Sequence, residues 1–166
     1  MISSFENHAG RWMMDAKSRP VTIMLVDDDA DCRMLVRDAI SEGGLGNPVM
    51  EAADGREALR LLKSRADNSA LPGLIFLDIE MPHMNGLETL KCIKADPRLR
   101  HIPVVMMTGV SDETHMRYAA ELGANSYTLK PANAEQFLQT VVASTNYWLS
   151  IHQYPEHRLP QAACKR

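Results

Sequence analysis

The chain has 166 residues and a mass of 18.5 kDa, a size that suits one domain. Hydrophobic residues make up 45% of it and charged residues 23%, so disorder throughout the chain is excluded and a substantial core is expected. The net charge of -3 gives no electrostatic reason to expect nucleic acid or an anionic membrane as the main partner.

The cysteines and the N-terminal residues carry signals about the compartment. Cys32, Cys92 and Cys164 lie far apart and form no CxxC or Cys/His cluster, which favours a reducing cytoplasm. Residues 1–20 include several charges and lack the apolar stretch of a secretory signal, so we expect a flexible leader there. No run approaches the roughly 20 apolar residues that span a bilayer, so no membrane segment is predicted.

Five short apolar runs alternate with segments of helical spacing. Nearly unbroken apolar runs are typical of strands covered on both faces, as in a parallel sheet with helices on each side. The sequence therefore predicts an α/β fold of five strand-helix units across residues 21–147. The predicted strands are Val21–Val26, Val49–Ala53, Leu74–Leu77, Val104–Met107 and Ser126–Leu129.

Polar residues that can cap a helix follow closely on several of these strands. Each precedes a Glu, Gln or Thr by three residues, and its side chain can accept a hydrogen bond from a free backbone N–H group of the first turn. Glycines and a proline then indicate where helices end. The predicted cap pairs are Asp54 with Glu57, Asn85 with Glu88, Ser111 with Thr114 and Asn133 with Gln136, and the predicted ends lie at Gly43, Pro97 and Gly123.

The residues that end the strands form a chemically coherent set. The first strand runs into three aspartates at 27–29, the third into Asp78, the fourth into Thr108 and the fifth into Lys130. Because ligands of doubly wound sheets bind outside the carboxyl ends of the strands, we expect these side chains to converge on one edge. Carboxylates gathered there repel one another, and a hard cation with oxygen ligands is the natural compensation. A Mg²⁺ site is therefore predicted.

Four short motifs together resemble the receiver domain of two-component response regulators. They are Val26-Asp27-Asp28, the segment from Leu77 to Gly86, Met107-Thr108-Gly109 and Leu129-Lys130-Pro131. The resemblance covers Val21 to about Tyr147. It implies a flavodoxin-like, three-layer α/β/α fold with five helices and a parallel sheet in the order 2-1-3-4-5.

The resemblance assigns the acidic residues to phosphoryl transfer. It implies that Asp78 is the phosphoacceptor, since a carboxylate can take a phosphoryl group from phosphohistidine when charge is neutralised and the groups are positioned. Asp28, Asp78 and the backbone carbonyl of Glu80 would ligate Mg²⁺, and Asp27 would act mainly through a bound water.

The resemblance also implies a way to report phosphorylation. Lys130 would pair with the phosphoryl group and the Thr108 hydroxyl would hydrogen-bond it. Tyr127 stands three residues before Lys130, where the family has an aromatic switch, so we expect it to move from exposed to buried on activation. The surface of the fourth helix, fifth strand and fifth helix would then change. Gly109 departs from the alanine that is more usual after the threonine, which leaves the lifetime of the phosphorylated state open.

Two other interpretations of the first aspartates were considered. Asp27, Asp29 and Asp31 resemble the start of a calcium loop, but Cys32 stands where that loop needs glycine. A phosphatase of the haloacid dehalogenase type would use Asp27 as nucleophile, but its other motifs are not evident. A helix cap at Asp29 and a solvated first turn at Asp31 is the simpler interpretation.

The end of the sequence predicts an assembly in place of an output domain. Residues 149–166 form an extension too short for a DNA-binding or enzymatic domain, so we expect a stand-alone receiver over residues 21–148. We expect a phosphoacceptor protein that assists its own phosphorylation and dephosphorylation, not an enzyme. Tyr147, Trp148, Leu149 and Ile151 form an apolar cluster that a homodimer could bury. The cluster resembles the ending of small receivers that serve bacterial phytochrome-type kinases. The alternative is that Trp148 folds back on its own domain.

These observations support two functional hypotheses that share one site. In the first, a sensor histidine kinase, in particular one of the phytochrome type, phosphorylates Asp78 with the help of Mg²⁺, and the altered surface signals to a partner. In the alternative, the chain is a phosphorelay intermediate that passes the group to a histidine phosphotransfer protein. The intact set of Asp27, Asp28, Asp78, Thr108 and Lys130 argues against an unphosphorylated scaffold.

Overall fold

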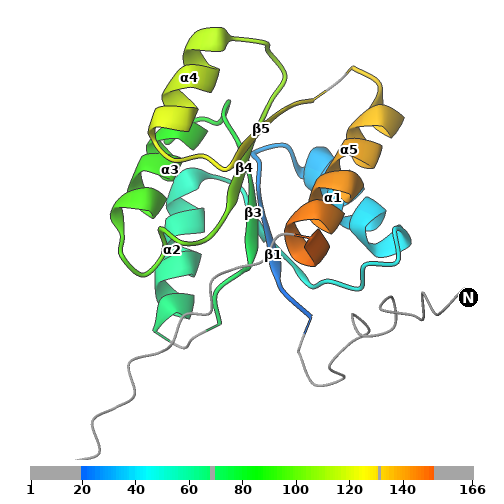
Figure 1. Ribbon diagram of the computed structural model, residues 1–166, viewed down its shortest axis with the longest axis horizontal. Helices are drawn as coiled ribbons and strands as arrows, with labels where there is room; N and C mark the ends of the chain where they lie inside the picture. The colour runs from blue at the N-terminus through cyan, green and yellow to red at the C-terminus, as the bar shows by residue number, and fades with distance from the viewer. Residues whose placement is uncertain (1–19, 68–69, 131, 152–166) are drawn as a thin grey trace, which may run out of the picture.

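The computed structural model describes residues 20–67, 70–130 and 132–151. Five parallel strands form one sheet in the order β2-β1-β3-β4-β5, which confirms the predicted topology (Figure 1). The strands are β1 (Ile23–Val26), β2 (Val49–Ala52), β3 (Leu74–Asp78), β4 (Val104–Thr108) and β5 (Ser126–Leu129). The helices are α1 (Ala30–Glu42), α2 (Gly55–Ala66), α3 (Gly86–Ala95), α4 (Glu113–Glu121) and α5 (Ala134–Asn146), followed by the π-helical turn η1 (Tyr147–Ile151).

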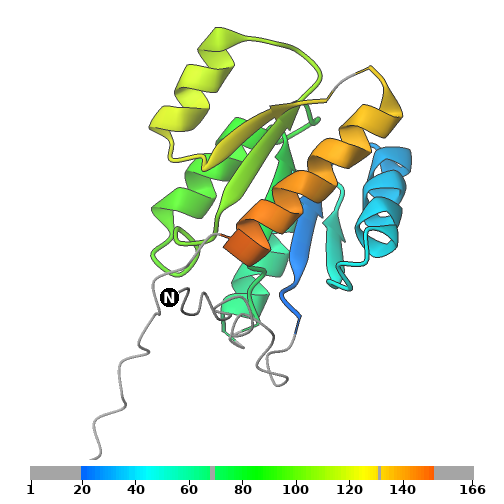
Figure 2. The same ribbon diagram turned by 45° about the vertical axis from the view of Figure 1, so that its right-hand side comes forward.

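The helices cover both faces of the sheet, as the apolar strand sequences require. Helices α1 and α5 lie on one face, and α2, α3 and α4 lie on the other (Figures 1 and 2). Along β1, Ile23 and Leu25 join the core under α1 and α5, whereas Met24 and Val26 join the core under α2 and α3. Each such fully buried side chain contributes on the order of 1.5–3 kcal/mol to folding.

The sequence placed most helix starts correctly. Asp29, Asp54, Asn85 and Asn133 are the N-caps of α1, α2, α3 and α5, and each side chain accepts hydrogen bonds from backbone N–H groups of the first turn. At α3 the bonds are reciprocal, because the Glu88 side chain also accepts from the Asn85 N–H. This pair fixes the start of the helix that follows the Asp78 strand.

The predicted start of α4 was wrong by one residue. Asp112, not Ser111, caps the helix, and its carboxylate accepts from the N–H groups of Thr114 and His115. The carboxylate carries a full negative charge at the positive end of the helix dipole, an advantage over the serine hydroxyl.

Two strands extend one residue beyond their predicted ends. Asp78 is the last residue of β3 and Thr108 is the last residue of β4. Asp78 is paired with Met107, and Thr108 with Leu129, so hydrogen-bonded backbone holds both candidate site residues. The rigid part of the sheet therefore reaches the site.

The Trp148 ring packs into its own domain, which is the alternative we considered to an interface position. Its side chain is 8% exposed within the core under α1 and α5, whereas Tyr147 is 47% exposed. The ring centroids of the two residues lie 5.3 Å apart in an edge-to-face arrangement. Trp148 therefore belongs to the core, and Tyr147 is the exposed aromatic residue of this turn.

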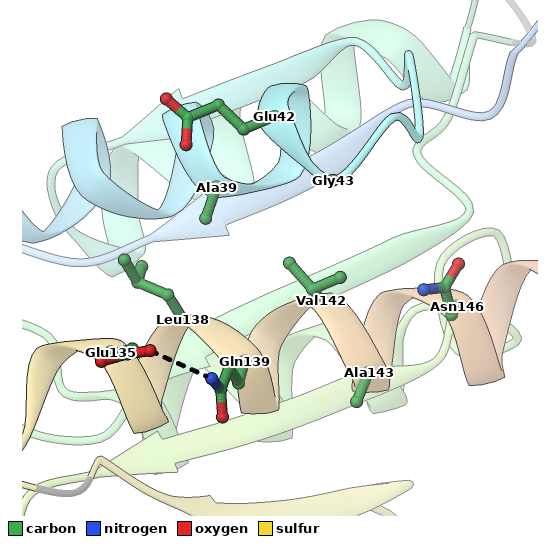
Figure 3. Close-up of a pocket in the computed structure, with 9 residues that line it drawn as sticks. All are labelled: Ala39, Glu42, Gly43, Glu135, Leu138, Gln139, Val142, Ala143 and Asn146. Carbon is green, nitrogen blue, oxygen red and sulfur yellow. Dashed lines mark hydrogen bonds between the residues drawn. The ribbon is translucent and has the colours of Figure 1, made fainter.

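A groove of about 680 Å³ runs between α1 and α5 (Figure 3). Leu138 and Val142 of α5 face Ala39 and Gly43 of α1 across it. The groove reaches Asn146, next to Tyr147.

Several predictions concern residues that the structure does not describe or describes only in part. The leader at 1–19 and residues 152–166 lie outside the described residues, so the predicted domain limits stay predictions. Within the described ranges, no helix is both long and apolar enough to cross a membrane.

Candidate functional site

Three aspartates meet at the carboxyl edge of the sheet. Asp27 and Asp28 directly follow β1, and Asp78 ends β3. One carboxylate oxygen from each lies within 4.8 Å of those of the other two. Asp27 and Asp78 are buried, with 0% and 4% exposure, while Asp28 is exposed. The cluster therefore opens to solvent on the Asp28 side.

Lys130 places a cation against the two buried carboxylates. Its Nζ donates a hydrogen bond of 2.6 Å to Asp27 Oδ2 and lies 3.1 Å from Asp78 Oδ1. Burial by itself would lower the pKa of Lys130, but the hydrogen bond to Asp27 and the charges of both aspartates raise it. The ammonium therefore stays charged. The Lys130 N–H also donates to the Thr108 carbonyl, which anchors the chain just after β5.

The Asp78 carboxylate retains an unused binding capacity. Burial is the main reason that its pKa rises to about 6; Lys130 opposes this rise and Asp27 adds to it. Asp78 Oδ1 is buried and pairs with the Lys130 ammonium at 3.1 Å, and within the described residues no second donor satisfies it. A buried carboxylate oxygen with spare acceptor capacity, beside two further carboxylates, fits an oxygen-seeking divalent cation.

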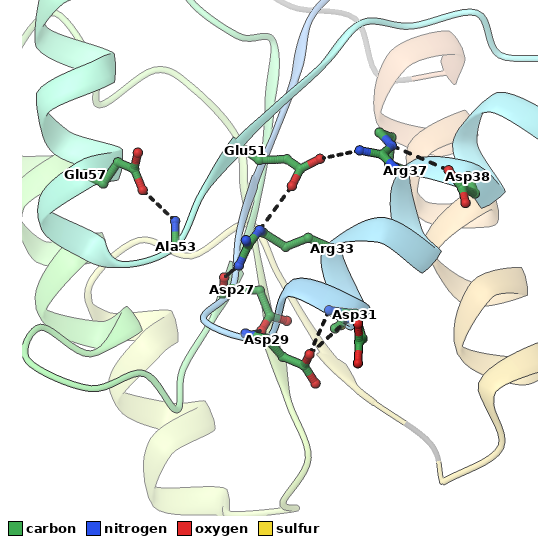
Figure 4. A network of polar contacts seen from close by, with 10 residues as sticks. Asp27, Asp29, Asp31, Arg33, Arg37, Asp38, Glu51, Ala53 and Glu57 are labelled. Carbon is green, nitrogen blue, oxygen red and sulfur yellow. Dashed lines mark hydrogen bonds and ion pairs between the residues drawn. The ribbon is translucent and has the colours of Figure 1, made fainter.

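The backbone around the cluster is held by local turns. Asp27 Oδ1 accepts from the Asp29 N–H at 2.9 Å, and Asp29 in turn caps α1 (Figure 4). On the other side, the Gly86 N–H donates to the Ile79 carbonyl at 3.0 Å. A Cβ atom on Gly86 would lie 2.1 Å from the Asp78 carbonyl oxygen, so only glycine allows α3 to start this close to Asp78.

Thr108 and Tyr127 lie behind the cluster. Thr108 is 1% exposed, and its hydroxyl donates to the Val110 carbonyl and accepts from the Val110 N–H, both at 3.2 Å. Tyr127 is half-buried against the core on the α2 and α3 side. Its hydroxyl oxygen is buried, and burial raises the pKa of Tyr127 while a contact with the Thr108 side chain opposes that rise.

The Tyr127 ring is partly buried, between the two positions of the predicted movement, and packs against this core. The movement itself stays a prediction.

The remaining predicted ligand is the Glu80 carbonyl, two residues beyond Asp78. The Glu80 side chain is exposed, and a Cβ atom on Gly109 would meet its Oε2 at 3.7 Å. The carboxylate therefore lies over Gly109, beside the entrance to the site. Its role as a backbone ligand stays a prediction.

Two contacts of the site escaped the sequence analysis. The Cys32 thiol lies against Asp27, and its pKa rises to about 12 through burial first and the hydrogen bond with Asp27 second. The Arg33 side chain donates to the Asp27 carbonyl. Both residues lie about one helical turn after the aspartates at 27–29. Their contacts with Asp27 depend on how α1 packs against the end of β1.

The geometry of these aspartates contradicts the calcium-loop alternative. The Asp29 side chain is engaged with the N–H groups of Asp31 and Cys32, and the acidic cluster uses Asp78 of another strand. The first turn of α1 is therefore a helix cap, as the simpler interpretation had it.

A doubly wound parallel sheet with three clustered aspartates and a lysine at its carboxyl edge defines a protein of the flavodoxin-like signal-receiver class. The sequence model of the response regulator receiver domain matches residues 23–142, so the chain belongs to that family. Membership places it among signalling proteins with sensor-kinase partners, and it overturns the phosphatase alternative.

Three proteins illustrate the similarity. A probable methanogenesis regulatory protein, FilR2 of Methanothrix harundinacea, is 34% identical over 137 residues, 82% of this chain and 88% of that protein. The response regulator Rcp1 of Synechocystis is 30% identical over 145 residues, 86% of this chain and 99% of its own. The solved structure of the phosphorylated cyanobacterial phytochrome response regulator RcpA has a TM-score of 0.77 and 32% identity, covering 82% of this chain and 99% of RcpA. A structure of Rcp1 with bound Mn²⁺ has a TM-score of 0.75 and 30% identity, covering 82% and 99% of the two chains.

Proposed function

We propose that this protein is a phosphoacceptor switch, in which Asp78 takes a phosphoryl group from the phosphohistidine of a sensor kinase. The observation that carries the proposal is the Asp78 carboxylate, buried within a cluster of three aspartates and paired with the Lys130 ammonium at 3.1 Å. One carboxylate oxygen of Asp78 would attack phosphorus while the bond from phosphorus to the imidazole nitrogen breaks, and the imidazole leaves.

The neighbouring residues would prepare this transfer. Asp27, Asp28 and Asp78, with the Glu80 carbonyl, would hold Mg²⁺, which supplies positive charge to the phosphoryl oxygens. The Lys130 Nζ lies 3.1 Å from Asp78 Oδ1 and would pair with the transferred phosphoryl group.

The new charge would be reported through Thr108 and Tyr127. The Thr108 hydroxyl would exchange its contact with Val110 for a phosphoryl oxygen, and the inward Tyr127 ring would fill the space behind it. The surface of α4, β5 and α5 would change in consequence. The similarity to RcpA, described as a phytochrome response regulator, supports a phytochrome-type kinase as the donor.

We also propose a homodimer through the end of α5. The exposed Tyr147 and the neighbouring end of the groove between α1 and α5 give this region apolar surface. Leu149, partly buried against the core, and Ile151 continue the same turn, although the Ile151 side chain lies outside what the structure describes.

Phosphorylation with a small donor tests the central proposal. The wild type and Asp78→Asn are incubated with acetyl phosphate, with and without Mg²⁺, and their intact masses are compared. We expect one added phosphoryl group only in the wild type and only with the metal. Asp31→Asn is the matched control, because Asp31 belongs to the first turn of α1 and not to the cluster, and it should be labelled like the wild type.

Equal labelling of Asp78→Asn would refute the assignment of the phosphoacceptor. Transfer of the label from the wild type to a histidine phosphotransfer protein would favour the relay alternative over a switch that acts by changing its surface.

A further inference from the structure

Arg33 of α1 connects the acidic cluster to the edge of the sheet. Its Nη1 donates a hydrogen bond of 2.7 Å to the carbonyl oxygen of Asp27, and its Nε donates one of 3.1 Å to Glu51 Oε2 on β2 (Figure 4). The Arg33 side chain is 16% exposed, so these two bonds account for a guanidinium that is largely removed from water.

Glu51 is itself held from two sides. Its Oε2 pairs with Arg33 and its Oε1 accepts from Arg37 Nη1 at 3.2 Å. Arg37 also contacts Asp38, and its side chain is 49% exposed. The two arginines therefore share one carboxylate, and of the two it is Arg33 that also bonds to the backbone of the site.

We propose that Arg33 is a positioning residue for the acidic cluster. The Asp27 carbonyl belongs to the peptide unit that joins Asp27 to Asp28. Because a peptide unit is planar, holding its oxygen fixes the direction in which the chain leaves Asp27 and enters Asp28. The Asp27 N–H is already bound to the Ala52 carbonyl, so Arg33 completes the restraint on the Asp27 backbone.

The inference rests on the proposed metal site and adds to it a residue that orients the backbone of the ligands. Residues that orient metal ligands typically change metal affinity by about 10- to 100-fold when they are removed. Asp28 is exposed, so the direction of its carboxylate depends on the backbone that carries it. Loss of the Arg33 bond is therefore expected to weaken Mg²⁺ binding while the carboxylates themselves remain.

Mg²⁺ titration by calorimetry on the full chain tests this. We expect Arg33→Ala to bind Mg²⁺ about 10-fold more weakly than the wild type. Arg37→Ala, which removes the other arginine on Glu51, should bind like the wild type. Arg33→Lys should recover most of the affinity, because an ammonium can still donate to the Asp27 carbonyl.

Hydrogen exchange in metal-free buffer gives a second measurement that does not depend on the metal. The Asp29 N–H, bound to Asp27 Oδ1, should exchange faster in Arg33→Ala and at the wild-type rate in Arg37→Ala.

The outcomes separate the two proposals. A wild type without Mg²⁺ binding refutes the metal site, and the exchange rates then decide on Arg33 alone. Wild-type affinity in Arg33→Ala, or an equal loss in Arg37→Ala, overturns the positioning role even if the metal site stands. Should Arg33→Ala fail to fold, Arg33→Met, which keeps the length of the side chain but has no donor for the Asp27 carbonyl, is compared with Arg37→Met, and equal affinities overturn the inference.

Discussion

Asp78 is a charged group in a place that disfavours its charge. Burial raises its pKa to about 6, although Lys130 stands beside it. At neutral pH the carboxylate is therefore ionised at the expense of folding free energy. The same ionised oxygen is what a phosphoacceptor needs, so the site gives up stability for reactivity.

Replacing Asp78 by Asn should stabilise the metal-free protein at neutral pH. Because the folded pKa of Asp78 lies above the ordinary value of 3.8, the folded state binds the proton more tightly than the unfolded chain does. The destabilisation is therefore absent below about pH 4 and complete above about pH 6. After allowance for solvent on the Asp28 side, we expect a gain of about 1–2 kcal/mol at about pH 7.5.

Urea unfolding with a chelator present, at about pH 7.5 and at about pH 4, measures the difference in unfolding free energy between Asp78→Asn and the wild type. Asp31→Asn serves as the control for removal of one acidic charge. A gain in Asp78→Asn that persists undiminished at about pH 4 would show that ionisation of Asp78 is not its cause.

At the scale of the element, α3 determines how the Asp78 strand ends. Its capping box of Asn85 and Glu88 fixes the first turn, and Gly86 brings that turn against the Asp78 backbone. Replacing glycine by alanine stabilises a helix by at most about 1 kcal/mol. That gain cannot offset a Cβ atom 2.1 Å from the Asp78 carbonyl oxygen, because the Cβ atom is fixed to its Cα and the oxygen belongs to the backbone, so neither can move aside cheaply.

Gly86→Ala should therefore destabilise the fold by about 1–3 kcal/mol and slow phosphorylation of Asp78. Gly109→Ala is the matched control, since its Cβ atom would meet only Glu80 Oε2, at an ordinary contact distance of 3.7 Å. Urea unfolding and acetyl phosphate labelling of both variants provide the measurement. Equal stability of the two variants would contradict the close approach of α3.

At the scale of the whole molecule, the sheet separates two cores. One lies under α2, α3 and α4, and the other lies under α1 and α5 and includes Trp148. The π-helical turn after α5 thus contributes to the fold through Trp148 and to the surface through Tyr147. The same short turn therefore holds one side chain for the core and one for the proposed dimer.

The two aromatic residues should respond differently to mutation. Trp148→Ala should cost about 3–5 kcal/mol in unfolding free energy, because it empties a core position. Tyr147→Ser should change stability little and convert a dimer to a monomer. Sedimentation equilibrium measures the second effect, and a wild type that sediments as a monomer would remove the dimer proposal.

The sequence by itself determined the architecture and predicted which charged residues gather at the carboxyl edge of the sheet. Unbroken apolar runs specify strands buried on both faces, and caps such as Asn85 are local hydrogen bonds, so both can be predicted from neighbouring residues. The parallel arrangement then placed Asp78 and Lys130 at one edge. The clustered residues could be predicted because each one ends a strand or directly follows one.

Only the tertiary structure decided how those groups act on one another. The bond from Lys130 to Asp27 joins residues 103 positions apart, and the raised pKa of Asp78 comes from burial that no local pattern expresses. The contact of Arg33 with the Asp27 carbonyl and the inward turn of Trp148 likewise depend on how α1 and α5 pack. Periodicity and capping act within a few residues, whereas burial and charge coupling depend on distances through space, which the packed chain alone fixes.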